Sequence, residues 1–232
     1  MSKNSIKATS EFLLVHRFCP QIQVGDTEKA RTFLVDNLPY FAEHEVRRGF
    51  KSMERIWQIA VGIPEDTIFL SKEFLDILLH VPPSVKSALL MVLFLQNMRT
   101  TPMKEALNDV IDNQKVLFET PSLDTLYETT HNLMTFHLAH GYDVDDITRE
   151  SCEWLSQHIF GENCINCIDL LAETLSVTFM CGYRNEVMSC KTLSILLQNQ
   201  HADGGFPIFA GGTSEFHSSL VCLWALTVSG YE

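Results

Sequence analysis

Apolar residues recur along this chain with the three-to-four-residue spacing of α-helices, and no segment alternates convincingly like a β-strand. The stretches 84–98, 167–181 and 220–228 are apolar nearly all round, whereas 103–115 and 143–157 keep a polar face. A helix that is apolar on every side is buried, and one with a polar face lies against solvent. The pattern therefore predicts an all-α fold in which outer helices cover inner ones in two layers.

Proline, glycine and capping residues mark the expected ends of the helices. Ser122 predicts the N-cap of a helix that ends at Gly141. The connections are short, which predicts antiparallel helical hairpins. Residues 1–10 are polar and predict a flexible N-terminal tail, so 11–232 is expected to form a single helical domain. Further helices are expected over 27–47, 69–80 and 185–200, from Asn163 to about Gly182, and after a cap at Ser214, with 13–19 and 57–61 in the core.

The heptapeptide QHADGGF, residues 200–206, stands at the junction of two predicted helices. The side chain of Asp203 can accept backbone N–H groups, and Gly204 and Gly205 permit positive φ angles. Phe206 then supplies an apolar plug under the turn. The five residues Gln200, Asp203, Gly204, Gly205 and Phe206 resemble the Q-x-x-D-G-G-F/W turn of the terpenoid cyclase and protein prenyltransferase superfamily.

The residues after this turn extend the resemblance. Segment 215–220 and Trp224–Leu226 look like the opening of the last inner helix in that superfamily. The resemblance implies an α/α toroid in which His217 faces the central cavity. In the prenyltransferases the matching histidine ligates zinc. However, the Asp and Cys of that zinc site have no counterpart here, which speaks against a zinc-dependent prenyltransferase.

A narrower resemblance covers roughly residues 120–230. It is to small bacterial members of the same superfamily that are associated with specialised metabolism, and it rests on Tyr127, Thr130, His131, Phe136, 169–173 and His217. The chain is too short for a complete ring of hairpins. An open or reduced toroid is therefore expected, or a homodimer that completes the cavity.

Three of these residues form the leading candidate site. His131, Glu173 and His217 each fall on a predicted inner helix. Imidazole and carboxylate groups suit zinc or iron, and the same trio in an apolar cavity suits acid–base catalysis. Tyr127 precedes His131 by four residues and shares its helix face, where it can orient the imidazole or line the pocket. The alternative is that these residues are unconnected and each has its own structural partners.

Two further motifs have plainer explanations. Asp143–Asp146 spells D-x-D-D, the acid motif of class II terpene cyclases, in which Asp145 would be the acid. The same carboxylates suit the N-terminus of an outer helix. Cys164 and Cys167 form a C-x-x-C pair that lacks an obvious third and fourth zinc ligand, so core cysteines are the favoured interpretation.

Composition narrows the class of partner. The chain is 46% hydrophobic and 20% charged, with a formal net charge of −12. This acidity argues against a nucleic-acid partner, which needs clustered Lys and Arg. No apolar run is long enough to span a bilayer, and no signal peptide is apparent. Seven scattered cysteines favour reduced thiols and a cytoplasmic location.

The sequence thus suggests three functions. The first is an enzyme of specialised metabolism that acts on a hydrophobic or carrier-tethered small molecule, with or without zinc or iron. The second is a non-catalytic module that binds a peptide, a lipid or a partner protein. The third is a small class II terpene cyclase.

Overall fold

The computed structural model describes residues 3–22, 25–34, 36, 78–95 and 97–230. Most of the helices predicted over 27–47 and 69–80, and the core segment 57–61, lie outside the described residues. The described part is predominantly helical, which confirms the all-α class. Its helices are α1 (Lys3–Phe18), α5 (Pro83–Leu95), α6 (Thr101–Leu117), α7 (Leu123–Leu138), α8 (Asp145–His158), α9 (Ile168–Met180), α10 (Glu186–Gln198) and α11 (Phe216–Val228).

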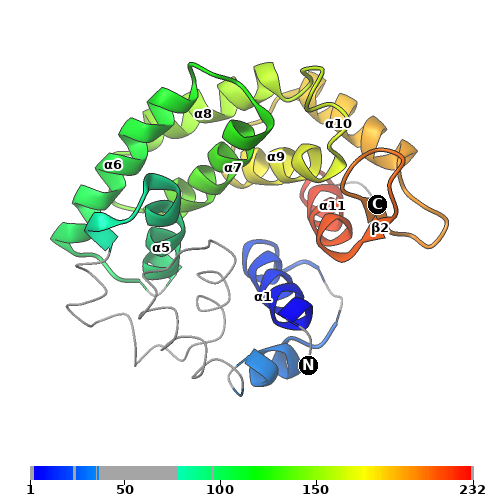
Figure 1. Cartoon of the computed structure of the whole chain (residues 1–232), viewed down its shortest axis with the longest axis horizontal. Coiled ribbons are helices and arrows are strands. Elements are labelled where there is room, and N and C mark those ends of the chain that lie inside the picture. The colour runs from blue at the N-terminus through cyan, green and yellow to red at the C-terminus, as the bar shows by residue number, and fades with distance from the viewer. Residues whose placement is uncertain (1–2, 23–24, 35, 37–77, 96, 231–232) are drawn as a thin grey trace.

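The helices form a two-layered arc. Figure 1 shows α6, α8 and α10 along the outer side and α5, α7, α9 and α11 along the inner side, with α1 beside α11. Each outer helix packs on the inner helix that precedes it, and the inner helices contact one another in sequence. The helices predicted to be buried are α5, α9 and α11, and those predicted to keep a polar face are α6 and α8. The two-layer prediction is therefore confirmed for these elements.

Burial explains why the inner layer is stable. Every residue of α9 from Ile168 to Thr178 is buried, whereas α10 buries only Met188, Thr192 and Leu196 along one stripe. At the α11 end of the inner layer, the ring of Phe18 stacks on the ring of Trp224 with centroids 5.8 Å apart. This contact joins α1 to α11. Aromatic burial of this kind contributes a large share of core stability.

Several predicted helix ends are confirmed and others are wrong. Ser122 forms a capping box with Thr125, as expected for the start of α7. Over residues 3–10 the structure has helix where the sequence predicted a tail, because α1 begins at Lys3 and is continuous with an apolar segment in which Leu13 is buried. No proline or glycine interrupts the helix there.

The predicted start of α9 at Asn163 is also wrong. The segment before α9 forms turns, closed by hydrogen bonds from Cys164 and Ile165 to the Gly161 carbonyl, and its last residues pair with the loop that follows residue 206. Ala210 donates its N–H to the Asn166 carbonyl, and Cys167 forms an isolated β-bridge with Phe209. The helix therefore begins only at Ile168. Since these contacts are distant in sequence, the local pattern did not indicate them.

A small hairpin, which the sequence did not predict, leads into α11. Strands β1 (Phe206–Pro207) and β2 (Ser214–Glu215) pair antiparallel. Ser214 consequently lies in β2 and does not cap α11, whose N-cap is Glu215. Ser218 donates a hydrogen bond to the Pro207 carbonyl at 2.7 Å, so the hairpin holds the first turn of α11.

The turn itself behaves largely as predicted. Asp203 Oδ1 accepts the Gly205 N–H at 2.9 Å, and Gln200 donates to the Gly204 carbonyl at 3.1 Å. Phe206 is buried. Only Gly204 needs a positive φ, of 84°. Gly205 is required for a different reason, since a Cβ there would lie 2.7 Å from the Ser214 side chain.

We expect Gly205→Ala to lower the free energy of unfolding by about 1–3 kcal/mol, the usual cost of overpacking. The added methyl group would collide with Ser214. Urea denaturation measures the loss. The double variant Gly205→Ala/Ser214→Gly should show a smaller loss than the sum of the two single variants, because the colliding atoms are removed. Purely additive losses would contradict this explanation.

Candidate functional site

A cluster of ionisable side chains lies within the inner layer. It comprises Glu11 on α1, His131 on α7, Asp169 and Glu173 on α9, and His217 in the first turn of α11. Asp169 and Glu173 are four residues apart and therefore share one face of α9. The turn and hairpin before α11 fix where that helix begins, and so place His217 beside this face. We call these five residues the carboxylate–histidine cluster.

The tightest part of the cluster consists of Asp169, Glu173 and His217. Each offers one ligand atom, and these atoms all lie within 4.8 Å of one another. The Nε2 atom of His217 is 3.5 Å from Asp169 Oδ2, and its Nδ1 atom is 3.3 Å from Glu11 Oε2. Both ring nitrogens of His217 therefore face a carboxylate. Asp169 and Glu173 are almost fully buried, at 4% and 3% exposure.

Glu173 links the tight group to His131. Its Oε1 atom lies 3.3 Å from His131 Nε2 and accepts a hydrogen bond of 2.5 Å from the Thr130 hydroxyl. His131 is half-buried on α7. The side chain of Glu173 is thus fixed by two residues of the neighbouring inner helix.

Asp169 is fixed by Tyr127. The Tyr127 hydroxyl donates a hydrogen bond of 2.8 Å to Asp169 Oδ2, and its oxygen lies 3.3 Å from Cys167 Sγ. The other carboxylate oxygen, Oδ1, is buried and has no hydrogen-bond partner among the described residues. A buried, unpartnered carboxylate oxygen is costly in a protein interior. A water molecule, a cation or a polar ligand at this place would satisfy it.

Electrostatics separates the two histidines. For His217, burial opposes the charged form, but the hydrogen bonds and charges of Asp169 and Glu11 outweigh it and raise the pKa to about 10. For His131, burial and the nearby charge of His217 lower the pKa to about 4. At neutral pH the metal-free protein therefore holds a cationic His217 beside a neutral His131.

The carboxyl group of Glu173 is poised between its two forms. Burial, together with the charge of Asp169, raises its pKa to about 7. Burial likewise raises the pKa of the Tyr127 hydroxyl far above its ordinary value, so Tyr127 stays a hydrogen-bond donor. Perturbed groups of this kind gather at functional sites.

A small cavity opens beside the cluster. Its volume of about 20 Å³ has room for a single water molecule or ion. Glu11, Glu173 and His217 contribute the polar part of its wall. The rest of the wall is apolar and consists of Leu14, Val15, Phe18, Met134, Val221 and Trp224.

The sequence-predicted site residues meet at this place. His131 contacts Glu173, while the ligand atom grouped with those of Glu173 and His217 belongs to Asp169. Tyr127 hydrogen-bonds to Asp169; its ring lies 6.5 Å from that of His131, centroid to centroid. Sequence reasoning missed Glu11 and did not single out Asp169 as a ligand. The i, i+4 spacing of two acids in an otherwise apolar helix was the available signal for Asp169.

The other two motifs lie apart from the cluster. Asp143, Asp145 and Asp146 are exposed at the start of α8, and Asp146 pairs with Arg149 at 2.9 Å. This placement favours helix-terminal carboxylates over a buried catalytic acid. Cys164 and Cys167 are buried, and all seven cysteines are free thiols.

Comparisons with family models, curated proteins and solved structures give no match for this chain. The resemblance to the terpenoid cyclase and prenyltransferase superfamily therefore stays a prediction. Among the described helices, none is both long and apolar enough to cross a membrane.

Proposed function

We propose that this protein is a metal-dependent enzyme whose divalent cation, zinc or iron, is bound by Asp169, Glu173 and His217. The observation that supports the proposal most strongly is that one potential ligand atom from each of the three residues lies within 4.8 Å of the other two. Tetrahedral ligands at about 2.1 Å from a cation lie about 3.4 Å apart. The 3.5 Å between His217 Nε2 and Asp169 Oδ2 agrees with this separation.

The surrounding contacts support the same proposal. A metal-bound histidine usually directs its second ring nitrogen at a carboxylate, which fixes the ring. Glu11 stands in that position, 3.3 Å from His217 Nδ1. Tyr127 fixes Asp169 in a similar way. A cation would also give the unpartnered Asp169 Oδ1 and the buried Glu173 a compensating charge.

His131 has a separate role in this proposal. Its lowered pKa keeps the imidazole neutral at physiological pH, so one ring nitrogen can accept a hydrogen bond or, as a weak base, a proton. It lies 3.3 Å from a proposed metal ligand, Glu173 Oε1. A bound cation supplies Lewis-acid activation of a water molecule or a substrate oxygen. His131 would take up the proton that such activation releases.

The substrate in this proposal is a hydrophobic small molecule. The apolar cavity wall next to the cluster supports this choice, because an apolar substrate keeps water from the reacting atoms. The narrower resemblance supports placing the enzyme in specialised metabolism. A class II cyclase mechanism would need an acid at Asp145, whose exposed position does not support it.

Elemental analysis of protein purified without affinity metals or chelator tests the proposal. We expect near-stoichiometric zinc or iron in the wild type and its loss in folded His217→Ala. His131→Ala should retain the metal, because His131 is assigned to proton transfer. His201→Ala, in the turn before α11, is the matched histidine control.

A wild-type protein that stays metal-free after reconstitution with zinc and with iron would contradict the proposal. The non-catalytic binding module would then become the better explanation. Metal that is retained in His217→Ala would place the cation elsewhere and would equally contradict it.

A further inference from the structure

A second pocket, of about 210 Å³, lies next to the cluster's cavity. Its wall differs in character, since it contains two arginines and two histidines. The full set of lining residues is Arg17, Phe18, Phe94, Leu95, Asn97, Arg99, His137, Leu138 and His140. No acidic residue belongs to this described wall, although the chain carries a formal net charge of −12. A cationic pocket on an acidic protein selects anions, because the rest of the surface repels them.

The two guanidinium groups are held in place by backbone carbonyls. Arg17 Nη2 donates to the Leu95 carbonyl at 2.8 Å. Arg99 donates to the carbonyls of Met98 and Leu138 at 2.6 Å and 3.2 Å, and its Cζ lies 4.7 Å from the centroid of the Phe94 ring. A guanidinium has five N–H donors, so these bonds fix its orientation and leave donors for a ligand.

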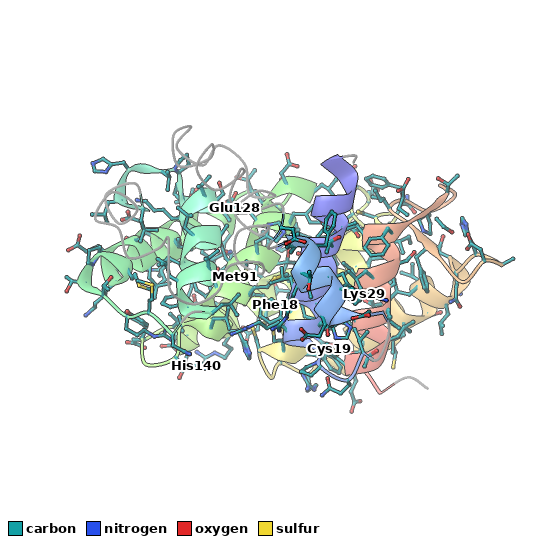
Figure 2. All side chains as sticks on the ribbon, turned by 90° about the horizontal axis from the view of Figure 1, so that it is seen from below. Phe18, Cys19, Lys29, Met91, Glu128 and His140 are labelled. Atoms are coloured by element: carbon teal, nitrogen blue, oxygen red, sulfur yellow. The ribbon has the colours of Figure 1, made fainter. Side chains whose placement is uncertain are left out.

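Phe18 connects this pocket to the cavity of the carboxylate–histidine cluster. It contributes to both walls. Figure 2 labels Phe18, on α1, and His140, just beyond the end of α7. Helix α7 likewise contributes to both walls, with Met134 in the cavity and Leu138 in the pocket. The pocket and the cavity are therefore neighbours along two helices.

Helix α1 sets the distance between them. Glu11, Leu14 and Phe18 share one face of α1 because they are three and four residues apart. At a rise of 1.5 Å per residue, the seven steps from Glu11 to Phe18 span about 10 Å. An apolar chain along this face would run from the arginines past the stacked pair Phe18 and Trp224 toward the cluster. Because the cavity at that end holds only about 20 Å³, the side chains that line it must move apart to admit such a chain.

We propose that the Arg17–Arg99 pocket binds the anionic head group of the substrate, a carboxylate or a phosphate monoester, while the apolar part of the molecule lies over Phe18 toward the carboxylate–histidine cluster. This inference names the substrate class of the proposed enzyme and rests on that function. Binding of the head group itself needs no metal. The arginines also cap the carboxyl ends of α5 and α7, and a purely structural role would affect stability without any anion binding.

Isothermal titration calorimetry with the metal-free protein tests the proposal. The probes are octyl phosphate, octanoate and neutral octanol. We expect saturable binding of at least one anionic probe and at least tenfold weaker binding of octanol. Comparing octyl phosphate with octanoate tells which head group the pocket prefers. Arg17→Gln and Arg99→Gln should each weaken binding about tenfold, the loss of one charge-assisted contact.

The control is Arg149→Gln, an exposed arginine on α8 that pairs with Asp146 and does not line the pocket. It should bind the probes like the wild type. Thermal unfolding of each variant checks that the fold is intact, and Arg17→Lys provides a milder change if Arg17→Gln does not fold. Absence of saturable binding, equal binding of octanol, or unchanged affinity in both folded pocket variants would overturn the proposal. Because no metal is present, such a failure leaves the metal site to be judged by its own tests.

Discussion

Asp169→Asn is expected to lower the affinity of the protein for zinc by about a hundredfold or more, which corresponds to about 2.7 kcal/mol. The change replaces a buried carboxylate, the proposed ligand, by a neutral amide of the same shape. It also removes the negative charge of the carboxylate, whose Oδ2 atom lies 3.5 Å from His217 Nε2 and accepts a hydrogen bond of 2.8 Å from the Tyr127 hydroxyl. Competition with a chromophoric chelator at neutral pH measures the affinity.

Two further variants make this prediction specific. Tyr127→Phe removes only the hydrogen bond that fixes Asp169, so we expect a smaller loss of about tenfold, the lower end of the range for such outer partners. Asp143→Asn changes an exposed acid at the start of α8 and should have no effect. Circular dichroism verifies the helical content of each variant. Equal affinities for Asp169→Asn and Asp143→Asn would show that Asp169 is not a ligand.

The second large effect is a steep dependence of zinc affinity on pH. His217 must lose its proton before Nε2 can bind a cation. Its pKa of about 10 means that the metal has to displace that proton throughout the neutral range. Below pH 7 the metal also displaces a proton from Glu173, whose pKa is about 7. His131 releases no proton when the metal binds, because its imidazole is already neutral above about pH 4.

We therefore expect the logarithm of the zinc affinity to rise with pH at a slope of about two below pH 7 and about one above it, since each displaced proton contributes a factor of ten per pH unit. Chelator competition between about pH 5.5 and about pH 8.5 spans the change. Calorimetry in buffers of different ionisation enthalpy should detect release of about one proton near pH 8. A pH-independent affinity would contradict the assigned protonation states.

The same charges influence the metal-free fold in a defined direction. The pKa of His217 is raised from 6.5 in a free imidazole to about 10, so its ion pairs contribute stability that is fully present below pH 6.5. That contribution declines as the pH rises through about 10. Zinc, which replaces the proton, should therefore stabilise the protein most on the alkaline side.

Much of the fold could be predicted from the sequence because the residues that mark a helix and its ends are close together in the chain. The segments 84–98, 167–181 and 220–228 are apolar nearly all round because each helix packs against other helices along its whole length. That pattern predicted their burial. Ser122 was predictable for the same reason, since its capping box lies within four residues. The turn at 200–206 has its own internal hydrogen bonds, which residue identity suffices to indicate.

The features that the sequence did not reveal depend on distant contacts. The start of α9 is fixed by pairing between residues about forty positions apart, such as Cys167 and Phe209. The one exception is the β1–β2 hairpin, which is local, but each of its strands has only two residues and so shows no alternating pattern. Glu11 was overlooked because it sits beside an apolar segment at the end of an apparent tail. Only the packing of α1 on α11 brings it to His217. The Arg17–Arg99 pocket likewise joins three helices and has no local motif.

The central claim is that Asp169, Glu173 and His217 share one cation. Anomalous diffraction from crystals of the zinc-loaded protein, with data on both sides of the zinc absorption edge, tests it most directly. We predict one strong peak about 2.0–2.2 Å from a carboxylate oxygen of Asp169, a carboxylate oxygen of Glu173 and His217 Nε2. No peak at this position in a zinc-loaded crystal, or a dominant peak at Cys164 and Cys167, would contradict the assignment.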